Sequence, residues 1–407
     1  MASTAGRVER IVIVGAGQAG GWAAKTLRAE GFAGSITLVG AEVHAPHERP
    51  PLSKAFLRGD VEPASTHLFK PSLFAALALD WRWGVSAKAI YRSERFVELE
   101  SGEQLPYDRL ILCMGGRARK LACSGAGSAD VHALRSIEDA QRLRNALMSS
   151  RNVVIVGGGW IGLEVAAAAA QVGANVHVVE VAPRLCARVL PPRVSELLQS
   201  LHERHGVRFS LGRTVASLRE SGLHRTVTLD DGSTIEAECV VAGIGLVPND
   251  ELARAAGLAC SGGIIVDRHC ATTDAAIFAA GDVAVAPNSC ARGAVRLESW
   301  QNAQDQGIAA ARAALGLGVA YDPIPKFWSD QYDANVQILG WPSGSADAVV
   351  RGDPASGRFL VFVVEGTRLR AVIAFNSGRE LRPARALIDT DVDVARLGDP
   401  SVALADV

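Results

Sequence analysis

Two short glycine-rich stretches have the residue types and spacing that bind dinucleotides. Each follows a run of four apolar, β-prone residues and precedes a helical segment. In a G-x-G-x-x-G turn between a strand and a helix, the glycines let the backbone approach a pyrophosphate, and the helix N-terminus attracts its charge. These glycines are Gly15, Gly17 and Gly20 in the first glycine turn and Gly157, Gly159 and Gly162 in the second. The chain is therefore predicted to bind two dinucleotides.

A carboxylate follows the second glycine turn at the distance expected for a ribose ligand. The predicted strand 175–179 ends directly in Glu180, which lies 18 residues after Gly162. A carboxylate at this place binds both ribose hydroxyls and repels a 2′-phosphate, so NADH is favoured over NADPH. Arg184 and Arg188 follow closely, and either could instead receive a phosphate.

The first glycine turn has no carboxylate directly at the end of its second strand. That strand, predicted over 35–39, is followed by a glycine and then by Ala41 and Glu42, so Glu42 is the nearest acid. The next loop, from Arg49 to Lys54, contains two prolines that stiffen it. A rigid loop with these cations can hold one against a phosphate or an electron-rich ring. An ordinary exposed proline turn is the alternative.

A Gly-Asp pair indicates which dinucleotide the first turn binds. A short strand is predicted to end in Gly281 and Asp282. A carboxylate at a strand end before a helix can bind a ribityl hydroxyl of a flavin, and it could equally cap that helix. The pair favours FAD for the first turn and leaves NADH for the second. The next long helix, predicted over 299–315, begins beside Glu298 and Trp300.

Composition and charge argue against several other classes of protein. The 407 residues are enough for two or three domains, and a formal net charge of −1 argues against a nucleic-acid binder. No apolar run approaches the roughly 20 residues of a membrane span. Seven cysteines show no C-x-x-C spacing, which predicts reduced thiols in the cytoplasm. His202 and His205 have no partner spaced for a metal site, and we expect both on a solvated helix surface.

The motifs predict an α/β fold with two Rossmann-like dinucleotide-binding domains and a C-terminal α+β domain. The nested arrangement of the two units resembles that of glutathione reductase. The second Rossmann unit interrupts the first, so the FAD-binding domain is discontinuous, at 8–118 and 248–324, around a NAD-binding domain at 119–247. The C-terminal domain is expected at 325–407, with antiparallel strands over 336–339, 358–364 and 369–375 and one helix over 379–388. Residues 1–8 are expected to be a disordered leader.

Six motifs occur in a fixed order along nearly the whole chain. They are Arg49-Pro-Pro-Leu-Ser-Lys54, Leu134-Arg135 before Glu138-Asp-Ala140, Gly157-Gly-Gly-Trp-Ile-Gly162-Leu-Glu164, Ala280-Gly-Asp-Val283, Glu298-Ser-Trp-Gln-Asn-Ala303 and Phe327-Trp-Ser-Asp-Gln-Tyr332. This set resembles the FAD-dependent, NADH-dependent ferredoxin reductases of oxygenase systems, the family of putidaredoxin reductase and the biphenyl dioxygenase reductase component.

The resemblance implies which residues surround each cofactor. FAD would lie at the first glycine turn, with Ala19, Ala41, Glu42, Arg49, Lys54, Ala87, Arg135, Gly281, Asp282, Trp300 and Trp328 around it. NADH would lie at the second, with Trp160, Ile161, Glu180, Arg188 and Gly245, and with Glu164 and Glu298 near the nicotinamide. No metal site is implied.

The resemblance also implies a reaction, in which a hydride passes from NADH to FAD and single electrons then pass to a [2Fe–2S] ferredoxin. That ferredoxin would serve a Rieske dioxygenase or a cytochrome P450. Lys54 and Glu164 are the expected catalytic residues, with the Lys54 cation near the flavin and Glu164 paired to it. A purely structural buried ion pair is the alternative.

Two other functions are possible for this fold. An NADH oxidase or peroxide-reducing flavoenzyme needs a redox cysteine near the flavin, and no cysteine precedes Cys113. An NADH-sensing protein of the apoptosis-inducing-factor type would be expected to carry targeting and basic segments. The ferredoxin partner is expected to be acidic and to dock transiently by electrostatics. Arg292 and Arg296 are candidate contacts, and an ordinary solvated loop is the alternative for them.

Overall fold

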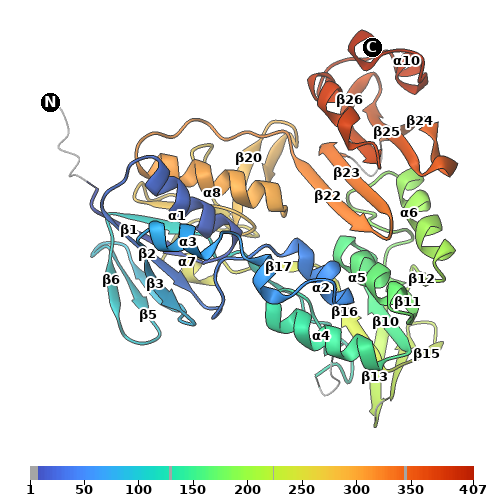
Figure 1. The fold of residues 1–407 in the computed structure, drawn as a ribbon, viewed down its shortest axis with the longest axis horizontal. Coiled ribbons are helices and arrows are strands. Elements are labelled where there is room, and N and C mark those ends of the chain that lie inside the picture. The colour runs from blue at the N-terminus through green and yellow to red at the C-terminus, as the bar shows by residue number, and fades with distance from the viewer. Residues whose placement is uncertain (1–7, 128–130, 223, 343–345) are drawn as a thin grey trace. The chain divides into compact units, whose positions relative to one another are not determined.

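The computed structural model describes residues 8–127, 131–222, 224–342 and 346–407 (Figure 1). The chain forms two compact units. The first comprises Met1–Glu48, Ala64–Arg117 and Val247–Pro323, and the second comprises Arg49–Pro63, Ala118–Leu246 and Ile324–Val407. Strands β8 (Gly116–Ala118) and β17 (Leu246–Pro248) pair where the chain passes between the units. The division into three domains stays a prediction, and most of the expected leader lies outside the described residues.

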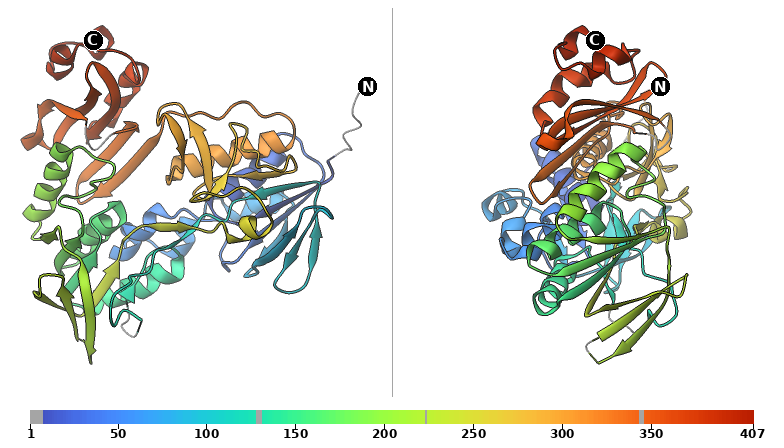
Figure 2. Two further views of the ribbon diagram at one scale, coloured as in Figure 1. Left: turned by 180° about the vertical axis from the view of Figure 1, so that it is seen from behind. Right: turned by 90° about the vertical axis from the view of Figure 1, so that its right-hand side faces the viewer.

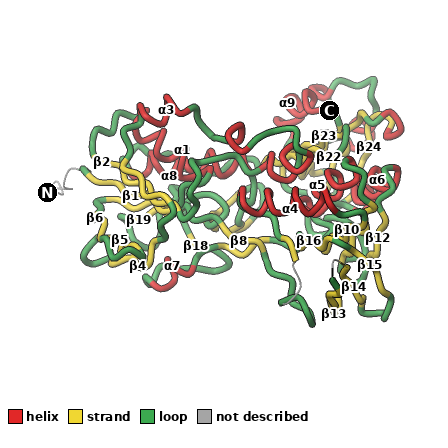
Figure 3. The backbone as a smooth tube through the Cα atoms, turned by 60° about the horizontal axis from the view of Figure 1, so that its bottom comes forward, coloured by secondary structure: helices red, strands yellow, loops and turns green. Residues whose placement is uncertain are grey.

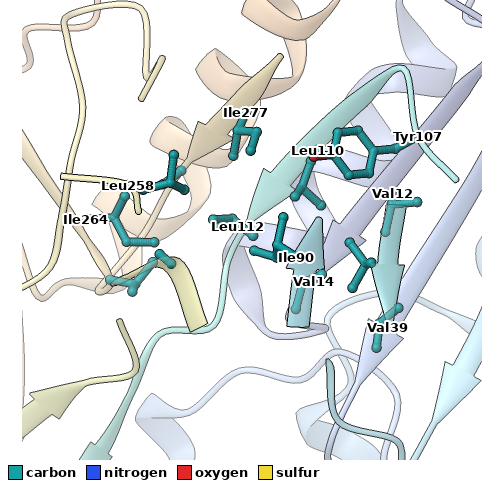
Figure 4. Close-up of a cluster of buried hydrophobic side chains, with 14 of the residues drawn as sticks. Val12, Val14, Val39, Ile90, Tyr107, Leu110, Leu112, Leu258, Ile264 and Ile277 are labelled. Atoms are coloured by element: carbon teal, nitrogen blue, oxygen red, sulfur yellow. The ribbon is translucent and has the colours of Figure 1, made fainter. Parts of the chain in front are cut away.

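A five-stranded parallel sheet organises the first unit. Its order is β19–β7–β1–β2–β3, with the strands at Ile277–Ala279, Arg109–Leu112, Arg10–Val14, Ser35–Gly40 and Asp80–Trp83. Alternate side chains of strand β1 point to opposite sides of the sheet, and both sets are buried. Ile11 and Ile13 pack with helices α1 (Gln18–Ala29) and α8 (Trp300–Ala314), which lie side by side (Figure 3). Val12 and Val14 belong to the cluster in Figure 4.

Smaller elements complete the first unit. An antiparallel sheet of β4, β5 and β6 covers the Val12 face of the parallel sheet, with Ile90 and Leu99 in the shared core (Figure 4). These strands span Ala87–Tyr91, Phe96–Leu99 and Gln104–Pro106. The remaining elements are β18 (Ile264–Ile265), β20 (Ala284–Asn288), β21 (Gly293–Val295), α3 (Pro71–Ala76) and α7 (Glu251–Ala255).

A second parallel sheet organises the other unit in the same manner. Its order is β12–β11–β10–β16–β9, with the strands at Arg208–Leu211, Asn175–Glu180, Asn152–Val156, Cys239–Ala242 and Val131–His132. Val153 and Ile155 pack with α4 (Ile137–Ser149) and α5 (Trp160–Gln171). Val154 and Val156 pack with a sheet of β13 (Val215–Ser221), β14 (His224–Leu229) and β15 (Thr234–Ala237). Helices α2 (Ala55–Arg58) and α6 (Pro192–Arg204) belong to the same unit.

Five antiparallel strands follow within the second unit (Figure 2). Their order is β22–β23–β26–β25–β24, at Lys326–Gln331, Ala334–Gly340, Arg368–Phe375, Arg358–Glu365 and Asp347–Asp353. One face packs on α5 and α6, where Leu163 and Leu198 meet Val336.

The single helix predicted over 379–388 is wrong. Only α9 (Leu381–Ala384) is α-helical there, between two 3₁₀ turns, and α10 (Val394–Gly398) follows. Pro383 lacks an N–H group and obstructs the preceding turn, which limits a longer helix. The predicted order of two Rossmann-like units and an α+β C-terminal part is nevertheless present. Among the described residues, no helix has the length and apolar character needed to cross a membrane.

Candidate functional site

The first glycine turn joins β1 to α1 through a backbone that favours glycine. Gly15 has φ +109°, and a Cβ added there would lie 2.2 Å from the carbonyl oxygen of Cys113. The N-cap of α1 is Gly17, which has no side chain with which to cap the helix. The first backbone N–H groups of α1 are therefore left for an anion, as a pyrophosphate site requires.

Gln18, the first residue of α1, is a candidate that the sequence did not single out. Both polar atoms of its side chain are buried, and neither has a hydrogen-bond partner among the residues that the structure describes. A dinucleotide at this turn would supply such partners, so the turn fits the cofactor. The only sequence signal is its place between the second and third glycines, where most residue types are allowed.

The Gly-Asp pair lies against the first glycine turn. A Cβ on Gly281 would lie 3.0 Å from the Cβ of Ala19, and the backbone N–H of Gly281 donates to the side chain of Gln306 on α8 at 2.9 Å. Asp282 follows directly, and its carbonyl oxygen accepts a hydrogen bond from Arg296 at 3.1 Å. The structure thus brings the two motifs predicted for FAD together.

Asp282 does not cap a helix. Strand β20 follows it, and the next long helix, α8, is capped by Ser299, whose hydroxyl accepts from the backbone N–H of Asn302 at 3.1 Å. The expectation that a helix follows the Gly-Asp pair is therefore wrong. Asp282 follows β19 and directly succeeds Gly281, which adjoins the turn, and the flavin role predicted for its carboxylate remains a proposal.

Two acids lie near the start of α8. Glu48 has a side-chain hydrogen bond with Trp300, and its partial burial raises the pKa of its carboxyl although that bond acts in the opposite direction. Glu298 forms a 2.7 Å ion pair with Arg296 and is largely exposed. These contacts hold the side chain of Trp300 and the carboxylate of Glu298 at the N-terminal end of α8.

The end of β2 carries the remaining predicted residues of the first unit. Ala41 is exposed, and Glu42 forms a 3.7 Å ion pair with His47 when that histidine is protonated. The backbone N–H of Val85 donates to Gly40 at 3.1 Å, which places the start of β4, at Ala87, near the end of β2. Among the described residues, no side-chain hydrogen bond or ion pair joins Ala87 to the glycine turn, so its role stays a prediction.

The second glycine turn repeats the backbone of the first. Gly157 has φ +111°, and a Cβ added there would lie 2.5 Å from the carbonyl oxygen of Gly243. The N-cap of α5 is Gly159, again without a capping side chain. The first N–H groups of α5 are thus arranged for a second pyrophosphate.

Glu180 binds directly to the second turn. One carboxylate oxygen accepts from the backbone N–H of Gly158 at 2.5 Å, and the other accepts from that of Ala182 at 2.8 Å. This orients the carboxylate at the place expected for the ribose hydroxyls of NADH. Arg184 donates to the carbonyl oxygen of Ala187 at 2.9 Å and to Ser195 of α6 at 3.0 Å, so its guanidinium is already engaged. Arg188 is exposed nearby in sequence.

Trp160 and Ile161 begin α5 with different surroundings. The ring of Trp160 packs against Phe327 of β22, with 4.8 Å between centroids, whereas Ile161 is 46% exposed. Gly245, at φ +108°, follows β16, and its carbonyl oxygen accepts from the backbone N–H of Arg119 at 2.9 Å. Trp160, Ile161, Glu180 and Gly245 therefore lie at or just after the C-terminal ends of β10, β11 and β16.

Lys54 and Glu164 form a buried ion pair. The Lys54 Nζ lies 2.7 Å from the Glu164 Oε2, and the two side chains are 13% and 3% exposed. Lys54 ends the turn formed by Pro50–Ser53 and also donates to the carbonyl oxygen of Pro50 at 3.2 Å. Glu164 lies on α5, just after the last glycine of the second turn. The proline-containing loop therefore holds the Lys54 ammonium against the Glu164 carboxylate, which follows the second glycine turn.

The other predicted FAD residues of the second unit lie nearby in its fold. Arg49 donates to the carbonyl oxygen of Arg135, and the backbone N–H of Arg135 donates to Asp139 at 3.0 Å. Trp328 is half-buried on β22, opposite Gln337. The residues predicted around FAD are therefore divided between the two units, with Arg49, Lys54, Arg135 and Trp328 in the second.

Comparison with known proteins covers almost the whole chain. Residues 9–307 match the family model described as pyridine nucleotide-disulphide oxidoreductase, and residues 326–407 match that described as reductase C-terminal.

Individual proteins are similar over their full length. The anthranilate 1,2-dioxygenase system ferredoxin–NAD(+) reductase component of Burkholderia cepacia is 41% identical over 97% of this chain and 98% of its own. Putidaredoxin reductase of Pseudomonas putida is 39% identical over 98% and 96%. The crystal structure of the ferredoxin reductase for the CYP199A2 system of Rhodopseudomonas palustris has a TM-score of 0.94, with 35% identity over 98% of this chain and 100% of that one.

Proposed function

Because the chain belongs to the pyridine nucleotide-disulphide oxidoreductase family, and within it to the ferredoxin–NAD(+) reductase components of oxygenase systems, we propose that it passes electrons from NADH through FAD to a small [2Fe–2S] ferredoxin. The terminal acceptor would be a Rieske dioxygenase or a cytochrome P450. The observation that carries this proposal is the unlike pair of glycine turns, one beside Asp282 and the other bound by Glu180.

The protein's own residues bind and orient the two cofactors. The backbone N–H groups of α1 and α5 hold the pyrophosphates, and Glu180 holds the adenosine ribose of NADH. FAD bound at the first turn would supply the link between the two-electron hydride of NADH and single-electron release. Lys54 presents a cation to the flavin, and Glu164 keeps that cation in one position, because a buried ammonium needs an oriented partner.

The oxidase and peroxide-reducing alternative lacks a suitable thiol at the first glycine turn. Cys113 is the first cysteine of the chain, and its carbonyl oxygen lies against Gly15. Burial raises the pKa of the Cys113 thiol, with a smaller effect from Cys270, so the reactive thiolate is suppressed. Ferredoxin reduction therefore fits this site better than thiol chemistry.

Anaerobic stopped-flow absorbance tests the proposed function. We expect NADH to bleach the flavin bands of the FAD-loaded protein, and a purified [2Fe–2S] ferredoxin from a Rieske dioxygenase system, or putidaredoxin, to restore them. Dioxygen or peroxide alone should restore the bands far more slowly. Fast reoxidation by dioxygen together with no electron transfer to any ferredoxin would favour the oxidase alternative.

The role of Lys54 is tested by the Lys54→Met variant. We expect the limiting rate of flavin reduction by NADH to fall about a hundredfold, a typical effect of removing an electrostatic group from a site. Lys88→Met is the matched control, because Lys88 forms an ion pair of the same 2.7 Å length with Glu98 on an exposed surface. An unchanged rate in Lys54→Met would show that the buried pair is only structural.

The cytoplasm is the location proposed for this reaction. It is where reduced thiols such as the seven cysteines persist, and where NADH and a ferredoxin are available together.

A further inference from the structure

A chain of buried polar side chains leads away from the Lys54–Glu164 pair. It begins at Glu164 on α5, passes through Ser329 and Gln331 on β22, and reaches His202 on α6 (Figure 1). His202 is completely buried, so the expectation that it lies on a solvated surface is wrong. All of these elements belong to the second unit.

The distances along this chain are those of normal hydrogen bonds. The Ser329 hydroxyl lies 2.6 Å from the Glu164 Oε1, and the Gln331 Nε2 lies 3.0 Å from the Ser329 Oγ. The Gln331 Oε1 lies 2.8 Å from the His202 Nε2, and the Tyr332 hydroxyl lies 3.0 Å from the His202 Nδ1. Ser329 and Gln331 share one face of β22 because alternate residues of a strand point the same way.

The carboxylate at one end determines the direction of every bond. A carboxylate only accepts, so Ser329 donates its single hydroxyl proton to Glu164. The Ser329 oxygen must then accept from the Gln331 amide, which leaves the Gln331 carbonyl oxygen to accept from His202. His202 therefore carries its proton on Nε2, and its Nδ1 accepts from Tyr332.

The electrostatics of the two aromatic groups agree with this direction. Burial lowers the pKa of His202 to about 4, so the ring is neutral and keeps one acceptor nitrogen. Burial raises the pKa of Tyr332, so its hydroxyl retains the proton that it donates. The ring of Tyr332 also stacks on His205 at 3.6 Å between centroids.

The chain constrains the oxygen of Glu164 that Lys54 does not use. Lys54 and Ser53 contact Oε2, whereas the Ser329 hydroxyl donates to Oε1. Both carboxylate oxygens are thus held from opposite sides, and rotation of the carboxylate would break bonds on each side. A hydrogen bond to a charged group is stronger than one between neutral groups. Among the hydrogen bonds between Glu164 and His202, the one from Ser329 to the carboxylate is therefore expected to be the strongest.

We propose that Ser329, Gln331 and His202 are positioning residues for the reaction, which hold Glu164 in the orientation that keeps the Lys54 cation in place. This inference rests on the proposed function for the meaning of the Lys54–Glu164 pair. It adds that the C-terminal sheet, through β22, takes part in flavin reduction without any of these three side chains being a catalytic residue.

Substitution of Ser329 tests the proposal in the FAD-loaded protein. We expect Ser329→Ala to lower the limiting rate of flavin reduction by NADH about tenfold, with the apparent dissociation constant of NADH unchanged. Ser329→Thr keeps the hydroxyl and should restore the rate to within about twofold. Ser210→Ala is the matched control, because the Ser210 hydroxyl lies 2.9 Å from His177 in the same unit but outside the chain.

A spectroscopic measurement on the resting protein separates positioning from activity. With ¹⁵N-labelled histidine, long-range ¹H–¹⁵N spectra should show His202 protonated only at Nε2 in the wild type and in Ser210→Ala. In Ser329→Ala the Gln331 amide loses its fixed direction, so the Nδ1-protonated form should appear. Tyr332→Phe removes the far end of the chain and should leave both the Nε2 proton and the rate nearly unchanged.

The outcomes separate this proposal from the proposed function. An unchanged rate and an unchanged tautomer in Ser329→Ala would overturn the positioning role, as would an equal fall in rate in Ser210→Ala. Failure of the wild type to reduce any ferredoxin would overturn the proposed function and leave the flavin-reduction and tautomer results to stand by themselves.

Discussion

The two glycine turns have nearly the same backbone and different side chains around it. Gly15 and Gly157 share positive φ angles, and each approaches the carbonyl of the residue that follows a neighbouring strand, Cys113 in one case and Gly243 in the other. The strand registers align them further, since Val14 pairs with Val39 as Val156 pairs with Val179. The next residues, Gly40 and Glu180, are therefore equivalent.

Two equivalent positions distinguish the turns chemically. The first turn has glycine where the second has Glu180, whose carboxylate binds the turn itself. Two residues after the last glycine, the first copy has Trp22, which packs on Phe69 at 5.4 Å between centroids, and the second has Glu164. The two turns thus share one backbone, and we propose that the side chains at these two positions determine which nucleotide each turn holds.

Replacing the last glycine of one turn at a time by alanine should produce the largest change in cofactor binding. An added Cβ would lie 1.9 Å from the Gly15 carbonyl in Gly20→Ala and 2.0 Å from the Gly157 carbonyl in Gly162→Ala. We expect Gly20→Ala to be purified almost without flavin, as read from its absorbance spectrum. Gly162→Ala should keep its flavin and show a KM for NADH raised at least about tenfold. Equal flavin loss in both variants would contradict the assignment of the turns.

The stability of the second unit should depend on pH because His202 is buried there. Above pH about 6.5 both folded and unfolded states hold this ring neutral. As the pH falls toward 4, the unfolded state binds a proton and the folded state does not, because the folded pKa is about 4. Stability is therefore lost as pH falls, by about 2 kcal/mol at pH 5.

The His202→Gln variant checks this titration, because glutamine does not ionise. Unfolding of the second unit in urea can be monitored through hydrogen exchange of the α6 amides at pH 7 and at pH 5. The loss of stability between these pH values should be smaller in this variant than in the wild type. Equal losses in the two proteins would show that His202 does not titrate between the folded and unfolded states.

Replacing Glu180, which ends β11, and Glu42, which follows β2, by alanine tests which turn selects NADH over NADPH. Glu180→Ala should lower the preference for NADH over NADPH, measured as the ratio of kcat/KM values, about tenfold, since the ribose loses a charge-assisted acceptor. Glu42→Ala should leave that ratio unchanged, because Glu42 belongs to the first turn. A shift of the ratio in Glu42→Ala alone would reverse the assignment of the two nucleotides.

The smallest expected effect concerns the helix caps of the two units. Ser299 caps α8, and Ser136 caps α4 in a capping box with Asp139. Each serine-to-alanine change should cost about 1 kcal/mol. We expect Ser299→Ala to increase flavin dissociation slightly, because α8 adjoins the Gly281–Asp282 pair, whereas Ser136→Ala should not. Fluorescence of released FAD measures the difference.

Much of the fold could be predicted because its signals are local. Four-residue apolar strands and the glycine turns that follow them each depend on neighbouring residues, and these appear in the structure as expected. The ion pair of Lys54 and Glu164 was implied by the resemblance to the ferredoxin reductase family, and it is present in the structure. The roles of the site residues remain predictions that the experiments above address.

Other features depended on residues far apart in the chain. Asp282 precedes a strand instead of a helix, and only Leu381–Ala384 of the helix expected over 379–388 is α-helical. Gln18 showed no distinguishing sequence signal, since its importance lies in buried polar atoms.

By itself, the sequence determined two dinucleotide turns, their order and the acid that follows the second, because spacing along the chain carries that information. Only the tertiary structure decided that Glu180 binds its own turn, that His202 is buried, and that Ser329 meets Glu164 across 165 residues of sequence. Burial and hydrogen-bond partnership are properties of packing between distant segments, and no local pattern encodes them.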